Sequence, residues 1–303
     1  MHRYLRSVGF STYKHKRKIE GLLTLLEQTT ENRNCIQFEK GVNLCEIRAE
    51  VAPGMGVTMI GEVDEHGSFQ REYYYPYLLS EDESSAAECS IQRHTEKETF
   101  AGLLDDNRVG ISLIFYLENG FEFQKRIMRR RPSRPVSVRL SSFSTEGKIL
   151  LPLHKTRRQI EMAKVAAMDR NNLLEAARNG DEEAMETLTI EDIDMYSQIS
   201  RRVMREDLYS IVDSCFMPSG IECDQYSVIG DILHVKEHQN RITSENIYDL
   251  TINCNDLVFH VGILKADLTG DPQPGRRFKG QIWMQGTVTF SENEEDCIYS
   301  NPK

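Results

Sequence analysis

The chain has 303 residues, of which 39% are hydrophobic and 28% are charged, and its formal net charge is −10. This length predicts about two domains. The composition excludes a chain that is disordered throughout, because enough apolar surface is present to offset the entropy lost on ordering. No apolar run approaches the roughly 20 residues that cross a bilayer, and the N-terminus lacks the apolar segment of a secretory signal. The seven cysteines are scattered with no C-x-x-C pair, so we expect reduced thiols and a cytoplasmic protein.

Helix and then strands are expected in the N-terminal part. Apolar residues at helical spacing predict a helix over residues 14–27. Residues 43–51 alternate as in a half-buried strand, with Glu46, Arg48 and Glu50 on the polar side. Residues 57–63 and 69–77 repeat this alternation. Tyr73, Tyr75 and Tyr77 share one face of the last strand, which is typical of a core or an interface.

Three local signals then predict the elements up to residue 153. Thr95 and Glu98 form a capping box, which predicts a short helix reaching Leu104. Asn119-Gly120 predicts a type I′ turn between strands 109–117 and 121–128. Two further strands are expected at 136–143 and 148–153.

Helices dominate the middle of the chain, and strands return after it. A second capping box, Thr156 with Gln159, starts a helix that ends at Asn179-Gly180, and another is expected over residues 190–207. Four strands are expected at 225–235, 246–254, 257–264 and 279–290. Gly230 permits a sharp bend in the first of them, which favours a small curled barrel.

The sequence therefore predicts the α+β class. An N-terminal domain, residues 1–153, combines an antiparallel β-sheet with helices, and a helical segment spans 154–212. A β-rich C-terminal domain, 213–290, forms a small OB-like barrel, and an acidic tail occupies 291–303.

Positive charge is concentrated between residues 125 and 158, where eleven Lys or Arg residues stand against one acid. This stretch carries +10, so the rest of the chain carries −20. Guanidinium groups hold phosphate or carboxylate oxygens in pairs, so the arginines here are a candidate anion-binding site. They are Arg126, Arg129, Arg130, Arg131 and Arg134. The alternative is a solvated linker, and the acidic overall charge argues against a nucleic-acid partner.

One motif points to a metal. His234, Glu237 and His238 match the H-x-x-E-H pattern, in which two histidines one helical turn apart bind zinc. That chemistry requires a helix, whereas the preceding residues favour a strand. Cys215 and Cys223 have the right ligand types for zinc, but their spacing is too long for the usual knuckle. Glycine-rich nucleotide loops, G-x-S-x-G and kinase signatures are absent from the sequence.

Three segments resemble a bacterial family found mainly in clostridia. They are residues 1–11 (MHRYLRSVGFS), 215–226 (CFMPSGIECDQY) and 275–283 (GRRFKGQIW). The family is a domain of unknown function of about 300 residues and covers the whole chain. The resemblance implies a cytoplasmic bacterial protein, and it brings no activity or catalytic residues with it.

The absence of catalytic signatures favours a noncatalytic binding or assembly protein, although an enzyme is not excluded. The expected partner is another protein or a second copy of the chain, with no membrane and no cofactor. Two alternatives stay open. One is a metal-dependent hydrolase that uses His234 and His238, and the other is nucleic-acid or anion binding through residues 125–158.

Overall fold

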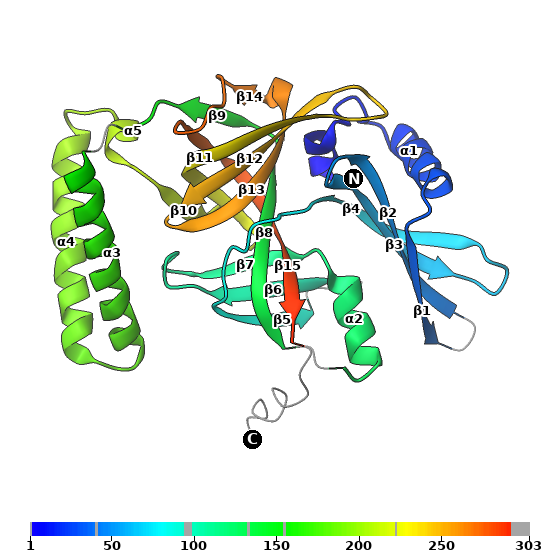
Figure 1. Cartoon of the computed structure of the whole chain (residues 1–303), viewed down its shortest axis with the longest axis horizontal. Coiled ribbons are helices and arrows are strands. Elements are labelled where there is room, and N and C mark those ends of the chain that lie inside the picture. Colours follow the sequence, from blue (N-terminus) through cyan, green and yellow to red (C-terminus); the bar gives the residue numbers. More distant parts are fainter. Residues whose placement is uncertain are drawn as a thin grey trace.

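Two β-sheets organise the chain in the computed structural model, which describes residues 2–39, 42–93, 99–131, 134–153, 156–221 and 223–291 (Figure 1). The first sheet is antiparallel, with its strands in chain order. Its strands are β1 (Arg33–Glu39), β2 (Val42–Ala52), β3 (Met55–Val63) and β4 (Phe69–Leu78). The α+β class is confirmed.

Two short N-terminal helices complete the core of this first sheet. They are the 3-10 helix η1 (Arg3–Val8) and α1 (Lys16–Thr29). The expected apolar stripe of α1 is confirmed, because Ile19, Leu22, Leu23 and Leu26 are all buried in one core with residues of β2 and β3. The helix therefore forms because its apolar face is covered by the sheet.

The second sheet is mixed and contains eleven strands. Its N-terminal members are β5 (Glu88–Arg93), β6 (Phe100–Asp105), β7 (Ser112–Leu117), β8 (Pro135–Ser144) and β9 (Gly147–Leu150). Its C-terminal members are β10 (Cys215–Pro218), β11 (Gln225–Gln239), β12 (Asn246–Cys254), β13 (Leu257–Leu264), β14 (Leu268–Thr269) and β15 (Arg277–Phe290). A 3-10 turn, η2 (Lys265–Asp267), precedes β14. The four predicted C-terminal strands are confirmed.

The strand pairings of the second sheet return to their starting point. β11 pairs with β12, β12 with β13, β13 with β8, β8 with β15, and β15 again with β11. The member from the N-terminal half, β8, lies between β13 and β15. The sheet is thus built from both of the segments, 1–153 and 213–290, that the sequence assigns to separate domains.

Two predicted elements are wrong. Thr95 and Glu98 lie outside the described residues, but Phe100–Asp105 forms strand β6 rather than a helix. Residues 121–128 are not a hairpin strand, because Gly120–Met128 forms helix α2. Asn119 explains the second error. Its Oδ1 accepts from Val288 N at 3.0 Å and its Nδ2 donates to Val288 O at 2.9 Å, so β15 holds the turn residue at the start of the helix.

The helical middle forms an antiparallel hairpin of α3 (Arg157–Arg178) and α4 (Glu182–Val203), followed by the single turn α5 (Leu208–Ile211). Figure 1 shows the hairpin standing at one side of the molecule, apart from the strands. The first predicted helix is confirmed, and the second begins at Glu182 rather than near residue 190. In the described ranges no helix combines the length and the apolar character that crossing a membrane requires.

The expectation that all cysteines are reduced is wrong for one pair. Cys35 on β1 and Cys45 on β2 stand opposite each other in the strand register and form a disulfide. Cα atoms only 4.2 Å apart allow this bond between neighbouring antiparallel strands. The pairing could not be read from the sequence, since it depends on which residues of two strands face each other.

Candidate functional site

The α3–α4 hairpin is set by signals at both ends of each helix. Thr156 and Gln159 make the reciprocal capping-box bonds at the start of α3. Gly180 has φ +92°, which a side chain would resist, and it reverses the chain after α3. Asp181 then caps α4, accepting from the backbone N–H groups of Glu183 and Ala184 at 3.0 and 3.1 Å. The two helices are joined across the hairpin by Arg170 and Asp192, whose charged groups are 2.7 Å apart.

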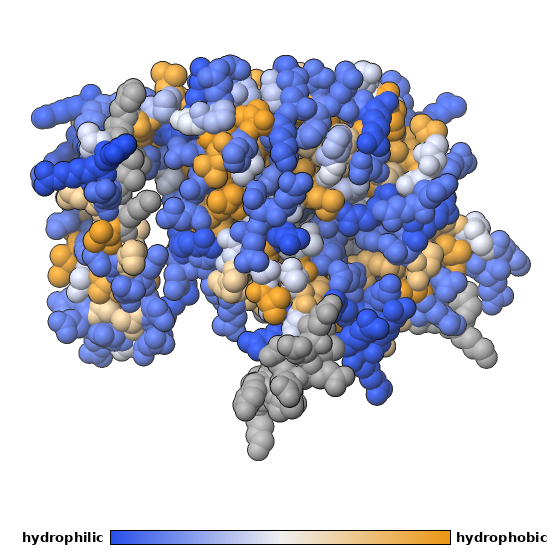
Figure 2. Space-filling view, in the orientation of Figure 1, coloured by the Kyte–Doolittle hydropathy of each residue, from blue (hydrophilic) through white to orange (hydrophobic). Residues whose placement is uncertain are grey.

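Only a narrow strip of α4 is covered. Among the described side chains of this helix, Ala184 and Leu188 are the buried ones. The large apolar side chains of the hairpin that remain exposed are Met162, Val165, Met168, Met185, Ile190, Ile193, Met195, Tyr196, Ile199 and Val203. Tyr196 is 75% exposed and Met168 is 66% exposed. Figure 2 shows apolar residues gathered on the hairpin among charged ones. Clusters of this kind mark interaction surfaces on soluble proteins.

A pocket of about 820 Å³ lies at the base of the hairpin. Ala167 of α3 contributes to one wall, and the middle of β11, the end of β12 and the turn after β12 supply most of the rest. Its lining carries three carboxylates, Asp213, Asp231 and Asp256, together with His234. This acidic lining differs from the apolar face of the hairpin.

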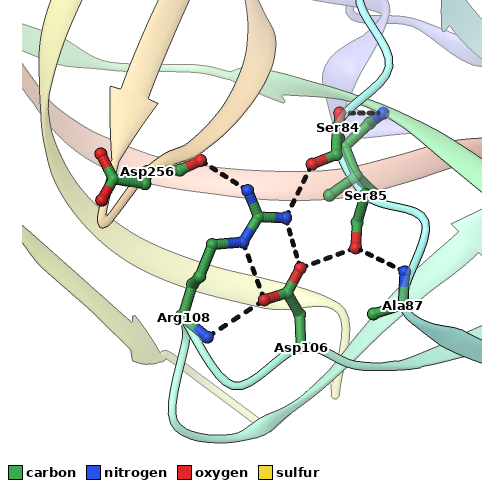
Figure 3. Close-up of polar contacts among 7 residues, drawn as sticks. Ser84, Ser85, Ala87, Asp106, Arg108 and Asp256 are labelled. Carbon is green, nitrogen blue, oxygen red and sulfur yellow. Dashed lines mark hydrogen bonds and ion pairs between the residues drawn. The ribbon is translucent and has the colours of Figure 1, made fainter. Parts of the chain in front are cut away.

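Arg108 connects three loops beside this pocket (Figure 3). Its Nη1 donates to the carbonyl of Asp256 at 2.8 Å, and its Nη2 donates to the carbonyl of Ser84 at 2.9 Å. Its Nε donates to buried Asp106 at 2.9 Å, and Ser85 donates to the same carboxylate at 2.6 Å. Burial acts to raise the pKa of Asp106, but the hydrogen bonds from Arg108 and Ser85 outweigh it and lower that pKa. The network thus links the loops that carry Ser84, Asp106 and Asp256, the last of which lines the pocket.

A second hollow, of about 460 Å³, lies between the first sheet and the start of α2. Glu46 on β2 is only 6% exposed in it and stands opposite Asn34 of β1. Burial raises the pKa of Glu46 to about 7, partly opposed by the positive charge of Arg48. The polar side of β2 was expected to face water. Instead α2 and the preceding loop approach it, so the carboxyl is desolvated.

The groups around Glu46 are engaged with one another. Arg48 Nη2 lies 2.6 Å from Glu118 Oε1, and its guanidinium stands over the ring of Tyr77 at 4.3 Å. Thr287 donates to the other oxygen of Glu118 at 3.1 Å. Among the described lining residues there is no Ser, Thr or Cys. The hollow therefore offers a carboxyl that exchanges its proton near neutral pH, and its described lining has no Ser, Thr or Cys side chain for that carboxyl to activate.

A buried histidine that the sequence analysis did not single out lies in the second sheet. His260 Nδ1 is 2.8 Å from Asp249 Oδ1, and its Nε2 is 3.1 Å from Asp82 Oδ2. Burial acts to lower the pKa of His260, but the hydrogen bonds and charges of these two aspartates outweigh it and raise that pKa. With both ring nitrogens engaged, His260 joins β13 to β12 and to the β4–β5 connection.

The histidines of the H-x-x-E-H pattern lie on strand β11 and not on the helix that the pattern requires. His234 is exposed opposite Thr251, and half-buried His238 stands opposite Ile247. Residues four apart on a strand are about 13 Å from each other. Within the ranges that the structure describes, no three His, Cys, Asp or Glu side chains are grouped as metal ligands.

The predicted arginine cluster lies at the end of α2. Arg126 is partly occupied, since it is 3.0 Å from Glu122 and stands over the ring of Phe290 at 5.0 Å. Arg126, Arg129 and Arg131 line a hollow of about 270 Å³ with Lys125 and Glu122. Arg130, at φ +51°, lies in the turn after the helix, and the carbonyl of Arg134 accepts a backbone hydrogen bond from Ser291. The structure thus brings three of the five arginines to one hollow.

The tyrosines in the row on β4 are buried to different degrees. Tyr75 and Tyr77 are each 4% exposed, and Tyr75 donates to the carbonyl of Glu118 at 3.0 Å. Of the two possibilities for this face, core or interface, the structure confirms the core for Tyr75, with Tyr73 packed against it, whereas the buried ring of Tyr77 lies under Arg48 at the second hollow.

A family model described as "Domain of unknown function, E. rectale Gene description (DUF3881)" matches residues 5–286. The chain belongs to this family. Comparison with curated proteins finds no match, and comparison with solved structures finds none. The family covers both sheets and the hairpin, so the hairpin lies within the matched region.

Proposed function

We propose that this chain is a noncatalytic assembly protein whose α3–α4 hairpin binds another protein through its exposed apolar side chains. The observation that carries this proposal is the exposure of ten large apolar residues on two helices that stand away from the sheets. An isolated pair of helices is held mostly by tertiary packing. Side chains such as Tyr196 and Ile193 contribute nothing to that packing, so a partner that covers them accounts for their presence.

The properties of the partner follow from the hairpin. Its contact surface is apolar at the centre, to cover Ile193 and Tyr196, and charged at the rim, because acids and arginines border these residues. A cytoplasmic location is part of the proposal. It agrees with the sequence resemblance, and the Cys35–Cys45 disulfide is the feature that argues against it.

Site-specific photocrosslinking in cells tests the proposal. A photoreactive residue at Tyr196 is expected to form a crosslinked protein band, because this position is 75% exposed at the centre of the hairpin face. The matched control is Met217 on β10, which is 56% exposed but lies outside the hairpin. Equal or absent crosslinking at both positions contradicts the proposal.

A second candidate function is anion binding at the end of α2. It is supported by the hollow that Lys125, Arg126, Arg129 and Arg131 line. Inorganic phosphate, titrated calorimetrically, is expected to bind the wild type and to bind an Arg129→Ala/Arg131→Ala variant at least tenfold more weakly. Unchanged binding in that variant contradicts this candidate.

We also propose that the closed ring β11–β12–β13–β8–β15 corresponds to the small barrel expected from the sequence, with β8 as a member from the N-terminal half. Its support is the return of the pairings to β11.

A further inference from the structure

Charge is unevenly distributed along the hairpin. The half nearest its tip, residues 168–192, has eight acids against two arginines, a net charge of −6. The half at its base, residues 157–167 and 193–203, has five Lys or Arg against two acids, a net charge of +3. The described acids at the tip, such as Glu182 and Glu186, are exposed, and so are Arg157 and Arg201 at the base. The hairpin is therefore acidic at one end and basic at the other.

We infer that the partner of the hairpin is a second copy of this chain, bound antiparallel about a two-fold axis, so that two hairpins form a four-helix bundle. This inference rests on the proposed function. A surface with opposite charges at its two ends is complementary to itself when one copy is turned end for end. The acidic tip of each copy then lies beside the basic base of the other. A parallel pair would place two tips of charge −6 together, which repulsion opposes.

The central apolar residues suit a two-fold axis. The midpoint of α4 falls between Asp192 and Ile193, and Ile193 and Tyr196 are 61% and 75% exposed there. An axis that passes near the midpoint brings these residues of one copy onto the same residues of the other. Tyrosine at the centre of an interface is typical of residues that dominate binding. Met185 lies 11 residues before Tyr196 and Val203 lies 7 residues after it, which is about three and two full helical turns. All three residues therefore lie on the same side of α4.

The size of the hairpin is sufficient for a stable dimer. Each helix has 22 residues, so the hairpin is about 33 Å long at 1.5 Å per residue. Two helices packed about 9 Å apart present a face roughly 20 Å wide. The resulting contact is on the order of 650 Å² per copy, or about 1,300 Å² in total, which lies within the range of specific protein interfaces.

Two charge-reversed variants of the full chain test the inference by light scattering and sedimentation. The tip variant carries Glu175→Lys, Glu182→Lys, Glu183→Lys and Glu186→Lys, which changes the tip half from −6 to +2. The base variant carries Arg157→Glu and Arg201→Glu, which changes the base half from +3 to −1. The wild type is expected to be a dimer at micromolar concentrations. Each variant alone is expected to dimerise at least tenfold more weakly, because like charges now meet. An equimolar mixture of the two is expected to form a heterodimer of near wild-type affinity, since opposite charges meet at both ends. Circular dichroism verifies that both variants are folded.

A Tyr196→Asp variant provides an independent test of the apolar centre. It is expected to be monomeric, and a Met217→Asp control on β10 is expected to remain a dimer. A wild type that stays monomeric up to submillimolar concentration overturns the inference, and so does a mixture that fails to pair. Dimerisation of either variant alone that is as tight as that of the wild type, or tighter, indicates a parallel arrangement, in which the substitutions reduce repulsion, and also overturns it. If the wild type is monomeric and Tyr196 crosslinks to a different protein, this inference is wrong, but the proposed function is still supported.

Discussion

The sheets and the α3–α4 hairpin use the same kinds of apolar residues in opposite ways. In the second sheet Phe115, Phe259 and Phe278 are fully buried, each at 0% exposure. In the hairpin Met168 and Tyr196 are exposed by 66% and 75%. The sheets thus bury their large apolar side chains in the folded core, whereas many large apolar side chains of the hairpin face water. The difference indicates that the stability of the fold comes mainly from the sheets, while the proposed function places binding in the hairpin.

The largest expected effect is a contrast between one core residue and one hairpin residue. Phe259→Ala is expected to lower the free energy of unfolding by about 3–5 kcal/mol, because it leaves a cavity among buried neighbours. Tyr196→Ala is expected to change it by less than about 0.5 kcal/mol. Urea denaturation at a protein concentration low enough to keep the chain monomeric measures both values. A loss of several kcal/mol for Tyr196→Ala would remove the distinction between the two regions.

The buried carboxyl of Glu46 extends the contrast to polar residues. Its folded pKa of about 7 is above the ordinary value of 4.5, so the folded state holds the proton more tightly. Stability from this group is therefore present at low pH and is lost as pH rises from about 4.5 to 7. The free energy of unfolding of Glu46→Gln, measured relative to that of the wild type, is therefore expected to be about 3 kcal/mol higher at pH 8 than at pH 4.

Glu50 is the matched control for this pH effect, because it lies on the same side of β2 but is exposed and paired with Arg241 at 3.0 Å. Glu50→Gln is expected to change stability by less than about 1 kcal/mol at every pH. Thermal denaturation from pH 4 to 8 compares the two variants. Parallel pH profiles for Glu46→Gln and the wild type would show that Glu46 is ionised normally in the fold.

The disulfide gives a smaller expected effect, confined to the first sheet. Cys35 and Cys45 are separated by 10 residues, and closing a loop of that length stabilises a protein by about 2–3 kcal/mol. Reduction is expected to lower the stability of the first sheet by that amount and to leave helix content unchanged. Denaturation with and without reductant measures it, and thiol alkylation followed by mass spectrometry shows whether the pair is oxidised in cells. Complete alkylation of both cysteines before reduction would exclude the bond.

The predicted elements that the structure confirms have a local and repeated signal in the sequence. Strands β11, β12, β13 and β15 have long β-branched and aromatic runs, and the helix α3 has a capping box at one end and Asn179-Gly180 at the other. The predictions that are wrong concern segments in which a distant contact overrides the local signal. Asn119-Gly120 has the residues of a hairpin turn, but the two hydrogen bonds to Val288 make it the start of a helix.

The candidate site was harder to predict than the fold. Motifs point to the arginines and histidines, whereas the hairpin has no motif and is distinguished only by the exposure of its apolar side chains. One signal was present in the sequence. Met185, Ile190 and Met195 lie at angles that a single buried face of α4 does not accommodate, so the helix has more apolar positions than packing on α3 requires. Glu46 gave no such signal, because its burial depends on the approach of α2.

The measurement that tests the central claim most directly is methionine oxidation footprinting. Met168 and Met195 of the hairpin are 66% and 51% exposed, and Met217 on β10 is 56% exposed. Peroxide treatment of dilute purified protein is expected to oxidise all three at similar rates. In intact cells, a covered hairpin predicts slower oxidation of Met168 or Met195 relative to Met217. Oxidation of all three at the same relative rates in cells and in dilute solution would show that nothing covers the hairpin, and would contradict the assignment of this face to assembly.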